Sequence, residues 1–183
     1  MGTLTVITGP MKSGKSKRLI EEYNKIQNKN KCLVAKPIID NRFSESEIIS
    51  RDGGHIKAIN IDNMTDLYQY TDEYNIFIID EIQFIEDAII GIKFLLDMNK
   101  DIIVSGLNLT SEMRPFNHMG DILCFADNII VLKGHCDICG EQYIGKYTYY
   151  DGDKNTTILV GDNKYKCVCQ NCYNLLNNKR LCK

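Results

Sequence analysis

The stretch GPMKSGKS, residues 9–16, places the narrowest limit on how this chain folds. It matches the pattern G-x-x-x-x-G-K-[ST] at every fixed position, which is typical of a loop whose main-chain N–H groups hold nucleotide phosphates. The apolar run LTVIT (4–8) before it predicts a strand, and residues 16–28 after it have apolar side chains at helical spacing. This is the context that a phosphate-binding loop needs; a glycine turn with an exposed lysine is the alternative.

Each residue type in this loop has a chemical reason to be there. Gly9 and Gly14 permit backbone angles and a close approach that a Cβ atom would block. We expect Lys15 to reach the β- and γ-phosphates of ATP, and the Ser16 hydroxyl to ligate Mg²⁺. The predicted ATP-binding loop comprises Gly9, Pro10, Met11, Lys12, Ser13, Gly14, Lys15 and Ser16.

Two acidic residues, Asp80 and Glu81, follow the apolar run IFII (76–79). Asp80 stands where nucleotide-hydrolysing enzymes with such a loop place the carboxylate of the magnesium shell. Glu81 is the candidate general base, which would take a proton from a substrate hydroxyl or from water. A carboxylate that only ends a strand and an ordinary surface acid are the alternatives.

Strand and helix patterns alternate from residue 4 to residue 133. Strands are expected at 4–8, 31–36, 55–61, 75–81, 101–107 and 128–133, and helices at 16–28, 64–70 and 88–98. The alternation predicts an α/β fold, with a parallel sheet flanked by helices as in P-loop NTPases. The helical periodicity ends near residue 134, so we expect a P-loop domain at 1–133 and a small zinc-binding domain at 134–183.

The chain has eight cysteines, five of them between residues 136 and 172. CDIC and CQNC are two C-x2-C pairs that together supply four thiolates for a tetrahedral Zn²⁺ site. The predicted ligands are Cys136, Cys139, Cys169 and Cys172. Four protein ligands leave no open position, so the zinc should be structural. Cys167 competes for the fourth place, and a chance cluster of cysteines is the alternative.

Composition excludes several classes of partner. The net charge of −2 and the pI of about 5.9 do not indicate a basic surface for nucleic acid. No stretch approaches the ~20 apolar residues of a membrane span, and the first residues lack the pattern of a signal peptide. We therefore expect a cytoplasmic protein that binds neither nucleic acid nor a membrane, and whose thiols stay reduced.

The order and spacing of six segments resemble the zinc-containing, type II family of thymidine kinases. The segments are GPMKSGKS, KCLVAKPIIDNRF, IIDEIQF, SGLN…RPF, CDIC and KYKCVCQNC, and the resemblance spans residues 2–173. It implies phosphorylation of thymidine to dTMP by ATP in nucleoside salvage, with Glu81 as the base that deprotonates the 5′-hydroxyl. It also implies a homotetramer and feedback inhibition by dTTP.

The resemblance also implies roles for individual residues. Phe84 stacks on the thymine base, and the pocket around the base is lined by Met11, Leu107, Ser111 and Phe116. The ATP-binding set gains Asp40, Arg42 and Gln83. A lasso loop at about 147–165 binds the thymine edge, and its contact residues are Thr156, Ile158, Leu159, Val160 and Tyr165.

Four positions depart from the family's pattern. Ser111 stands in place of an aromatic residue, Asn108 in place of an aspartate, and Lys12 in place of an aromatic or small residue. Lys146 stands where a threonine near the pocket is usual, with Thr148 two places on. Ser111 and Lys146 motivate one alternative, a degenerate homologue that only binds nucleotide. The paired cysteine motifs keep a second open, a zinc-ribbon ATPase that acts on nucleic acid.

Overall fold

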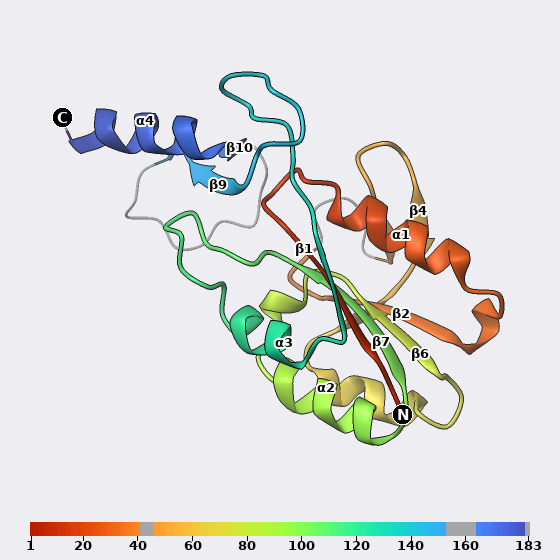
Figure 1. The fold of residues 1–183 in the computed structure, drawn as a ribbon. Coiled ribbons are helices and arrows are strands. Elements are labelled where there is room, and N and C mark those ends of the chain that lie inside the picture. Colours follow the sequence, from red (N-terminus) through yellow and green to blue (C-terminus); the bar gives the residue numbers. More distant parts are fainter. Residues whose placement is uncertain (41–45, 153–163, 182–183) are drawn as a thin grey trace.

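A parallel sheet forms the centre of the molecule in the computed structural model (Figure 1). Among the residues that the structure describes, 1–40, 46–152 and 164–181, six parallel strands pair in the order β5-β2-β6-β7-β1-β8. Their bounds are β1 (Leu4–Thr8), β2 (Cys32–Pro37), β5 (Ile59–Ile61), β6 (Ile76–Ile79), β7 (Asp101–Gly106) and β8 (Asn128–Val131). The predicted fold class is thereby confirmed.

Continuous apolar runs explain why β1, β2 and β6 lie inside the sheet. Every residue of β2 is buried, and Phe77, Ile78 and Ile79 of β6 have no exposed surface. Both faces of such a strand must be covered, which suits the interior of a parallel sheet. Thr8 pairs with Gly106, and Ile79 pairs with Val104. The carboxyl ends of β1, β6 and β7 therefore meet at one edge.

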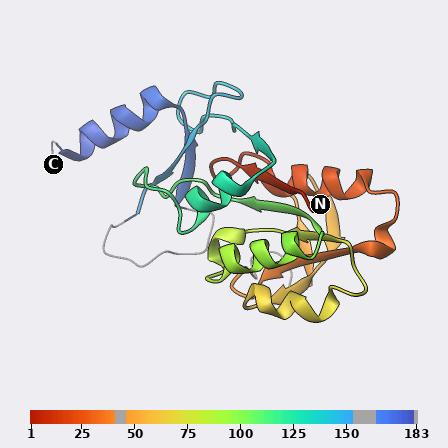
Figure 2. The ribbon, with the colours of Figure 1, turned by 60° about the horizontal axis from the view of Figure 1, so that its bottom comes forward.

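Helices cover both faces of the sheet (Figures 1 and 2). Helix α1 (Lys15–Lys25) packs on one face together with the hairpin of β3 (Glu47–Ile49) and β4 (His55–Lys57). The other face carries the 3-10 helix η2 (Met64–Tyr70), α2 (Ala88–Asp97) and α3 (Met119–Phe125). Two short 3-10 helices, η1 (Lys29–Lys31) and η3 (Ile82–Phe84), follow α1 and β6.

The structure departs from the sequence prediction at residues 55–61. The single strand expected there is divided at Ala58, because β4 pairs antiparallel with β3 while β5 pairs parallel with β2. The expected helix at 64–70 is the 3-10 helix η2, which begins at a capping box formed by Asn63 and Asp66. Helix α3 had no counterpart among the sequence predictions.

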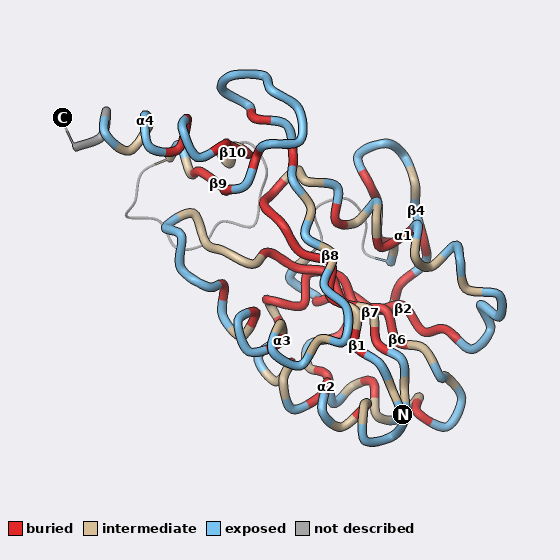
Figure 3. Tube along the Cα trace, viewed as in Figure 1, coloured by how far each residue is buried: buried red, intermediate tan, exposed pale blue. Residues whose placement is uncertain are grey.

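The chain after β8 forms a second, smaller packing unit that extends beyond the sheet (Figure 1). Strand β9 (Tyr147–Tyr150) pairs antiparallel with β10 (Tyr165–Val168), and α4 (Gln170–Leu181) follows. Tyr147, Tyr149 and Tyr173 are buried here around the cysteines. Figure 3 shows this buried cluster apart from the larger one in the sheet. The predicted lasso begins in β9 and ends at Tyr165; residues 153–163 lie outside the described part of the chain.

Within the described ranges, no helix combines the length and the apolar composition needed to cross a membrane.

Gly91 allows α2 to pack directly on η2. A Cβ atom at residue 91 would lie 2.1 Å from the Cβ of Met64, which is fully buried. We expect Gly91→Ala to lower the free energy of unfolding by about 1–3 kcal/mol, despite the roughly 1 kcal/mol by which alanine favours a helix. Denaturant unfolding measures the effect. Gly120→Ala in α3 is the matched control, since a Cβ there meets its nearest neighbour at 3.8 Å; equal stability of the two variants would contradict this packing.

Candidate active site

The phosphate loop joins β1 to α1, and the side chain of Lys15 bonds back to the main chain of the same loop. Lys15 Nζ donates a hydrogen bond to the Pro10 carbonyl at 2.9 Å, in a buried setting. Gly14 has φ 85°, and a Cβ atom on Gly9 would lie 2.5 Å from the Leu132 carbonyl oxygen. The Ser13 hydroxyl is buried without a hydrogen-bond partner among the described residues. A loop with this geometry at a helix N-terminus suits an anion such as a nucleotide phosphate.

The carboxylate of Asp80 lies at the end of β6, where three donors reach it. Ser16 donates to Oδ2 at 3.0 Å, and the Glu81 N–H donates to Oδ1 at 3.0 Å. The Ser105 hydroxyl, from the end of β7, also donates to Oδ1. The carboxylate therefore connects the phosphate loop with two neighbouring strands of the sheet.

Asp80 lies in an environment that disfavours its charge. Burial and, after it, the neighbouring Glu81 carboxylate raise the pKa of Asp80 to about 6, against the hydrogen bond from Ser105, which lowers it. A divalent cation would supply the missing positive charge, and hydroxyl and carboxylate oxygens are ligands that Mg²⁺ accepts. The Ser16–Asp80 pair thus fits a magnesium ion.

Glu81 is held at the same edge by an unusual backbone conformation. Its φ of 51° is left-handed, which places two successive carboxylates at the strand end, and its side chain is buried. Gln83 Nε2 donates to Glu81 Oε2 at 2.5 Å. The Gln83 Oε1 atom accepts from the Leu107 N–H at 3.1 Å. Gln83 thus orients the Glu81 carboxylate and ties it to the loop after β7.

The apolar residues predicted to surround a nucleoside base lie in one cluster. Phe84 and Phe116 meet edge to face, with ring centroids 5.6 Å apart. Met11 and Leu107 are buried in the same cluster, and Tyr165 of β10 packs against it. The carbonyl of Ser111, also predicted to line the pocket, accepts a hydrogen bond from the Tyr173 hydroxyl at 3.0 Å.

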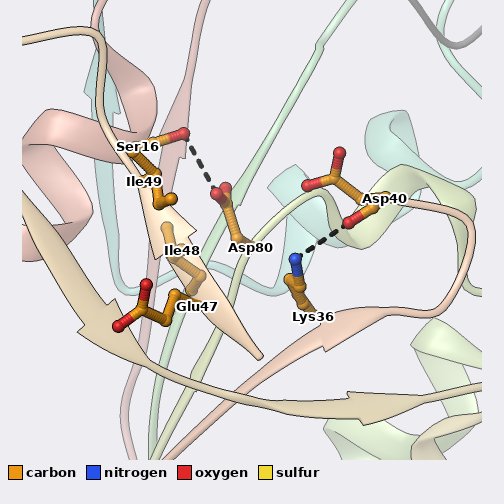
Figure 4. A pocket seen from close by; sticks show the side chains of 7 residues that line it. All are labelled: Ser16, Lys36, Asp40, Glu47, Ile48, Ile49 and Asp80. Carbon is orange, nitrogen blue, oxygen red and sulfur yellow. Dashed lines mark hydrogen bonds between the residues drawn. The ribbon is translucent and has the colours of Figure 1, made fainter. Parts of the chain in front are cut away.

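A pocket lies beside Asp80 and Ser16 (Figure 4). It is lined by Ser16, Lys36, Asp40, Glu47, Ile48, Ile49 and Asp80. Figure 4 shows Lys36 pointing to the main chain of Asp40, where its Nζ donates to the carbonyl at 2.9 Å. Lys36 is buried and belongs to β2, so this pocket is lined by one cationic residue and three acidic ones, Asp40, Glu47 and Asp80.

Four cysteines converge in the C-terminal unit. The sulfur atoms of Cys136, Cys139, Cys169 and Cys172 all lie within 4.8 Å of one another. A tetrahedral site with Zn–S bonds of about 2.3 Å has an S–S edge of roughly 3.8 Å, so a small contraction suffices. Although burial opposes the charge, main-chain N–H groups lower the pKa of Cys136 to about 6 and so favour its thiolate. These four residues can therefore hold a metal ion.

The family model for thymidine kinase matches residues 2–173. The chain belongs to the thymidine kinase family. A protein called thymidine kinase from Mycoplasma mobile is 35% identical over 176 residues, which cover 94% of this chain and 87% of that protein. Another of that name from Pseudothermotoga lettingae is 34% identical over 183 residues, covering 97% and 98%.

A solved structure titled ATPase superposes with a TM-score of 0.47 at 13% identity and covers 72% of this chain and 66% of that chain. The predicted family and class of enzyme, a thymidine kinase, are thus confirmed by the sequence relatives.

In this member of the thymidine kinase family, the structure decides which cysteines converge. Cys167 is not in the cluster; its sulfur packs where a Cβ atom on Gly145 would be 2.4 Å away, and burial raises the pKa of its thiol to about 11. Five predicted site residues lie outside the described part of the chain: Arg42, Thr156, Ile158, Leu159 and Val160.

The sequence assigned no role to three residues at the site of this thymidine kinase family member, although it showed Thr148 close to a position where a threonine is usual. Ser105 and Lys36 lie near the ends of β7 and β2, the two strands that flank β6. The strand order brings them to Asp80, and no local sequence pattern predicts that order. Thr148 accepts a hydrogen bond from the Met11 N–H at 2.9 Å, so a threonine does lie beside the phosphate loop although Lys146 is exposed.

The raised pKa of Asp80 predicts a stability cost in the absence of magnesium. Between pH 3.8 and about 6 the folded state holds more protons than the unfolded state, so stability falls as pH rises through this window. We expect the free energy of unfolding of Asp80→Asn to exceed that of the wild type at pH 8 by on the order of 1–3 kcal/mol. The variant should therefore unfold at a higher temperature, and the gain should shrink toward pH 4.

Thermal unfolding of both proteins without added magnesium measures the difference. Asp97→Asn, at an exposed position near the end of α2, is the control and should show no such gain. An Asp80→Asn variant less stable than the wild type at pH 8 would refute the argument.

Proposed function

We propose that the chain transfers the γ-phosphoryl group of ATP to the 5′-hydroxyl of thymidine, forming dTMP for deoxynucleoside salvage. The observation that carries the proposal is the buried Glu81 carboxylate, which is oriented by Gln83. Gln83 also bonds the main chain of Leu107, a member of the apolar cluster with Met11, Phe84 and Phe116. Family membership supports thymidine as the acceptor. The loop supports a nucleoside triphosphate as the donor.

Each side chain has a defined task in the transfer. The phosphate loop and Lys15 hold the donor phosphates, and the hydrogen bond from Lys15 to Pro10 is exchanged for one to a phosphate oxygen. Glu81 accepts the proton of the 5′-hydroxyl, while Gln83 keeps its carboxylate aimed at that oxygen. Little covalent chemistry is left to the protein, so positioning and electrostatics supply most of the rate.

Ser16 and Asp80 would hold a magnesium ion bound with ATP. Their oxygen atoms, 3.0 Å apart, lie beside the phosphate loop, and the raised pKa of Asp80 marks a place where positive charge is missing. Such an ion neutralises charge on the phosphates when bound. Asp40 and Arg42 complete the proposed ATP-binding set.

The four converging cysteines would hold a structural Zn²⁺ ion at the base of a lasso loop. The thiolate-favouring N–H groups around Cys136 and the mutual distances of the sulfur atoms support this assignment. We place the zinc-binding domain at 134–183 and the P-loop domain at 1–133. The lasso, at about 147–165, would bind thymine through Thr156, Ile158, Leu159, Val160 and Tyr165, with Ser111 nearby.

The remaining proposals follow from the family. The enzyme is a cytoplasmic homotetramer that is inhibited by dTTP and does not act on nucleic acid. The net charge of −2 supports the last point.

Replacing Glu81, the proposed general base, should slow the chemical step without weakening the binding of the donor nucleotide. We expect Glu81→Gln to lower kcat by roughly 10²- to 10⁴-fold and to change the Kd for MgADP by less than about threefold, because the carboxylate does not hold the donor. Glu86→Gln, at an exposed position in the same segment, is the matched control. If Glu81→Gln retains turnover within a few-fold of the wild type, Glu81 is not the base.

A substrate panel tests the reaction itself. ADP release is measured with each deoxynucleoside, with and without single-stranded DNA. Turnover with thymidine is the expected result. Hydrolysis that responds only to DNA would indicate an ATPase acting on nucleic acid, and nucleotide binding without turnover would indicate a degenerate homologue; either result overturns the proposal.

Metal content tests the cysteine cluster independently. We expect about one zinc ion per chain in the wild type and far less in Cys172→Ser, since three thiolates bind zinc less tightly than four. Cys124→Ser, an exposed cysteine outside the cluster, should retain the metal. Equal zinc content in both variants would exclude the four-cysteine site.

A further inference from the structure

Two successive residues of the phosphate loop are bonded to the cysteine-bearing unit. The Met11 N–H donates to Thr148 Oγ1 at 2.9 Å in a buried setting. The Lys12 ammonium lies 3.2 Å from Asp137 Oδ2. Both contacts span more than a hundred residues of sequence, and neither involves a group assigned to the chemical step.

Asp137 is a fixed partner rather than a freely moving surface acid. It lies between Cys136 and Cys139 in the CDIC pair, and its N–H donates to the Cys167 carbonyl at 2.8 Å. Its Oδ2 atom also accepts from the Cys167 N–H at 2.9 Å. These main-chain bonds hold the carboxylate in place whether or not Lys12 pairs with it. Only the Lys12 side chain therefore loses much conformational entropy when the ion pair forms.

Lys12 needs such support because its backbone is strained. Its φ is 64°, a left-handed conformation that costs a residue with a Cβ atom roughly 1–2 kcal/mol. A change in this angle would turn the peptide groups on either side, and these groups carry N–H donors of the phosphate loop. The side chains of Lys12 and Asp137 are 27% and 32% exposed, so solvent screens their attraction only in part.

We propose that the Lys12–Asp137 ion pair and the Thr148 hydroxyl are positioning elements, through which the cysteine cluster holds the phosphate loop in its nucleotide-binding conformation. The inference rests on the proposed function only in requiring that this loop binds the nucleotide donor. The metal site then affects ATP binding although none of its ligands touches a phosphate. Lys12 acts by facing Asp137, not by contacting the donor.

The direct test is the affinity for MgADP, measured by titration calorimetry on the zinc-loaded full chain. We expect Asp137→Asn to bind about three- to tenfold more weakly, with unchanged zinc content. Glu141→Gln removes an exposed carboxylate from the same knuckle and should bind as the wild type does. If Asp137→Asn binds as tightly as the wild type or more tightly, Lys12 contacts the phosphate directly and the proposal is wrong.

A double-mutant cycle tests whether the pair itself is responsible. Lys12→Met should weaken binding, and Lys12→Met combined with Asp137→Asn should be no weaker than Lys12→Met alone. Strictly additive effects would show that the two side chains act separately. In steady-state kinetics of each variant, the KM for ATP should rise while the KM for thymidine and kcat stay nearly constant. General destabilisation of the fold would not change the KM for ATP alone.

Thr148 provides a test that is independent of the cysteine knuckle, should Asp137→Asn lose zinc. Thr148→Val leaves the buried Met11 N–H without its acceptor, and we expect about tenfold weaker MgADP binding and faster hydrogen exchange at residues 9–16. Thr148→Ser keeps the hydroxyl and should restore both. Wild-type binding by Thr148→Val would overturn the proposal. Because no thymidine is present, these results stand whether or not the substrate panel supports the proposed reaction.

Discussion

The buried carboxylate of Asp80 is the constraint on which the site depends. It is held at the end of β6 by donors from the phosphate loop, from β7 and from the next residue of its own chain. Its burial is a consequence of the parallel sheet, which brings several strand ends to one edge. The raised pKa of Asp80 shows that burial disfavours its negative charge, and a bound cation is the simplest way to stabilise that charge. Holding a carboxylate at this buried position therefore lowers the stability of the fold, and the proposed magnesium ion would compensate for it.

The phosphate loop is held from two sides. Its serine reaches Asp80 in the sheet, while Met11 and Lys12 are bonded to Thr148 and Asp137 of the C-terminal unit. One short loop thus touches the proposed donor site, the proposed base pocket and the cysteine knuckle. In the proposed function, the small C-terminal unit would thus support donor binding as well as hold the lasso.

The sequence predicted those parts of the fold that local patterns encode. The strand, loop and helix at 4–28, the buried run before Asp80 and the convergence of the two C-x2-C pairs all follow from short segments. The division of 55–61 at Ala58 did not, because each half is defined by a strand elsewhere in the chain. Ser105, Lys36 and Thr148 were missed for the same reason, and the individual roles of Glu81 and the pocket residues stay predictions.

The sequence by itself determined the family, the phosphate loop and the four candidate metal ligands, because each is a run of residue types whose chemistry needs fixed short spacing. Only the tertiary structure decided that Cys167 packs against Gly145 instead of joining the cluster, and that Lys12 faces Asp137 across more than a hundred residues. The physical reason is that contacts between distant segments depend on strand order and on close packing. Neither can be read from the spacing of residues along the chain.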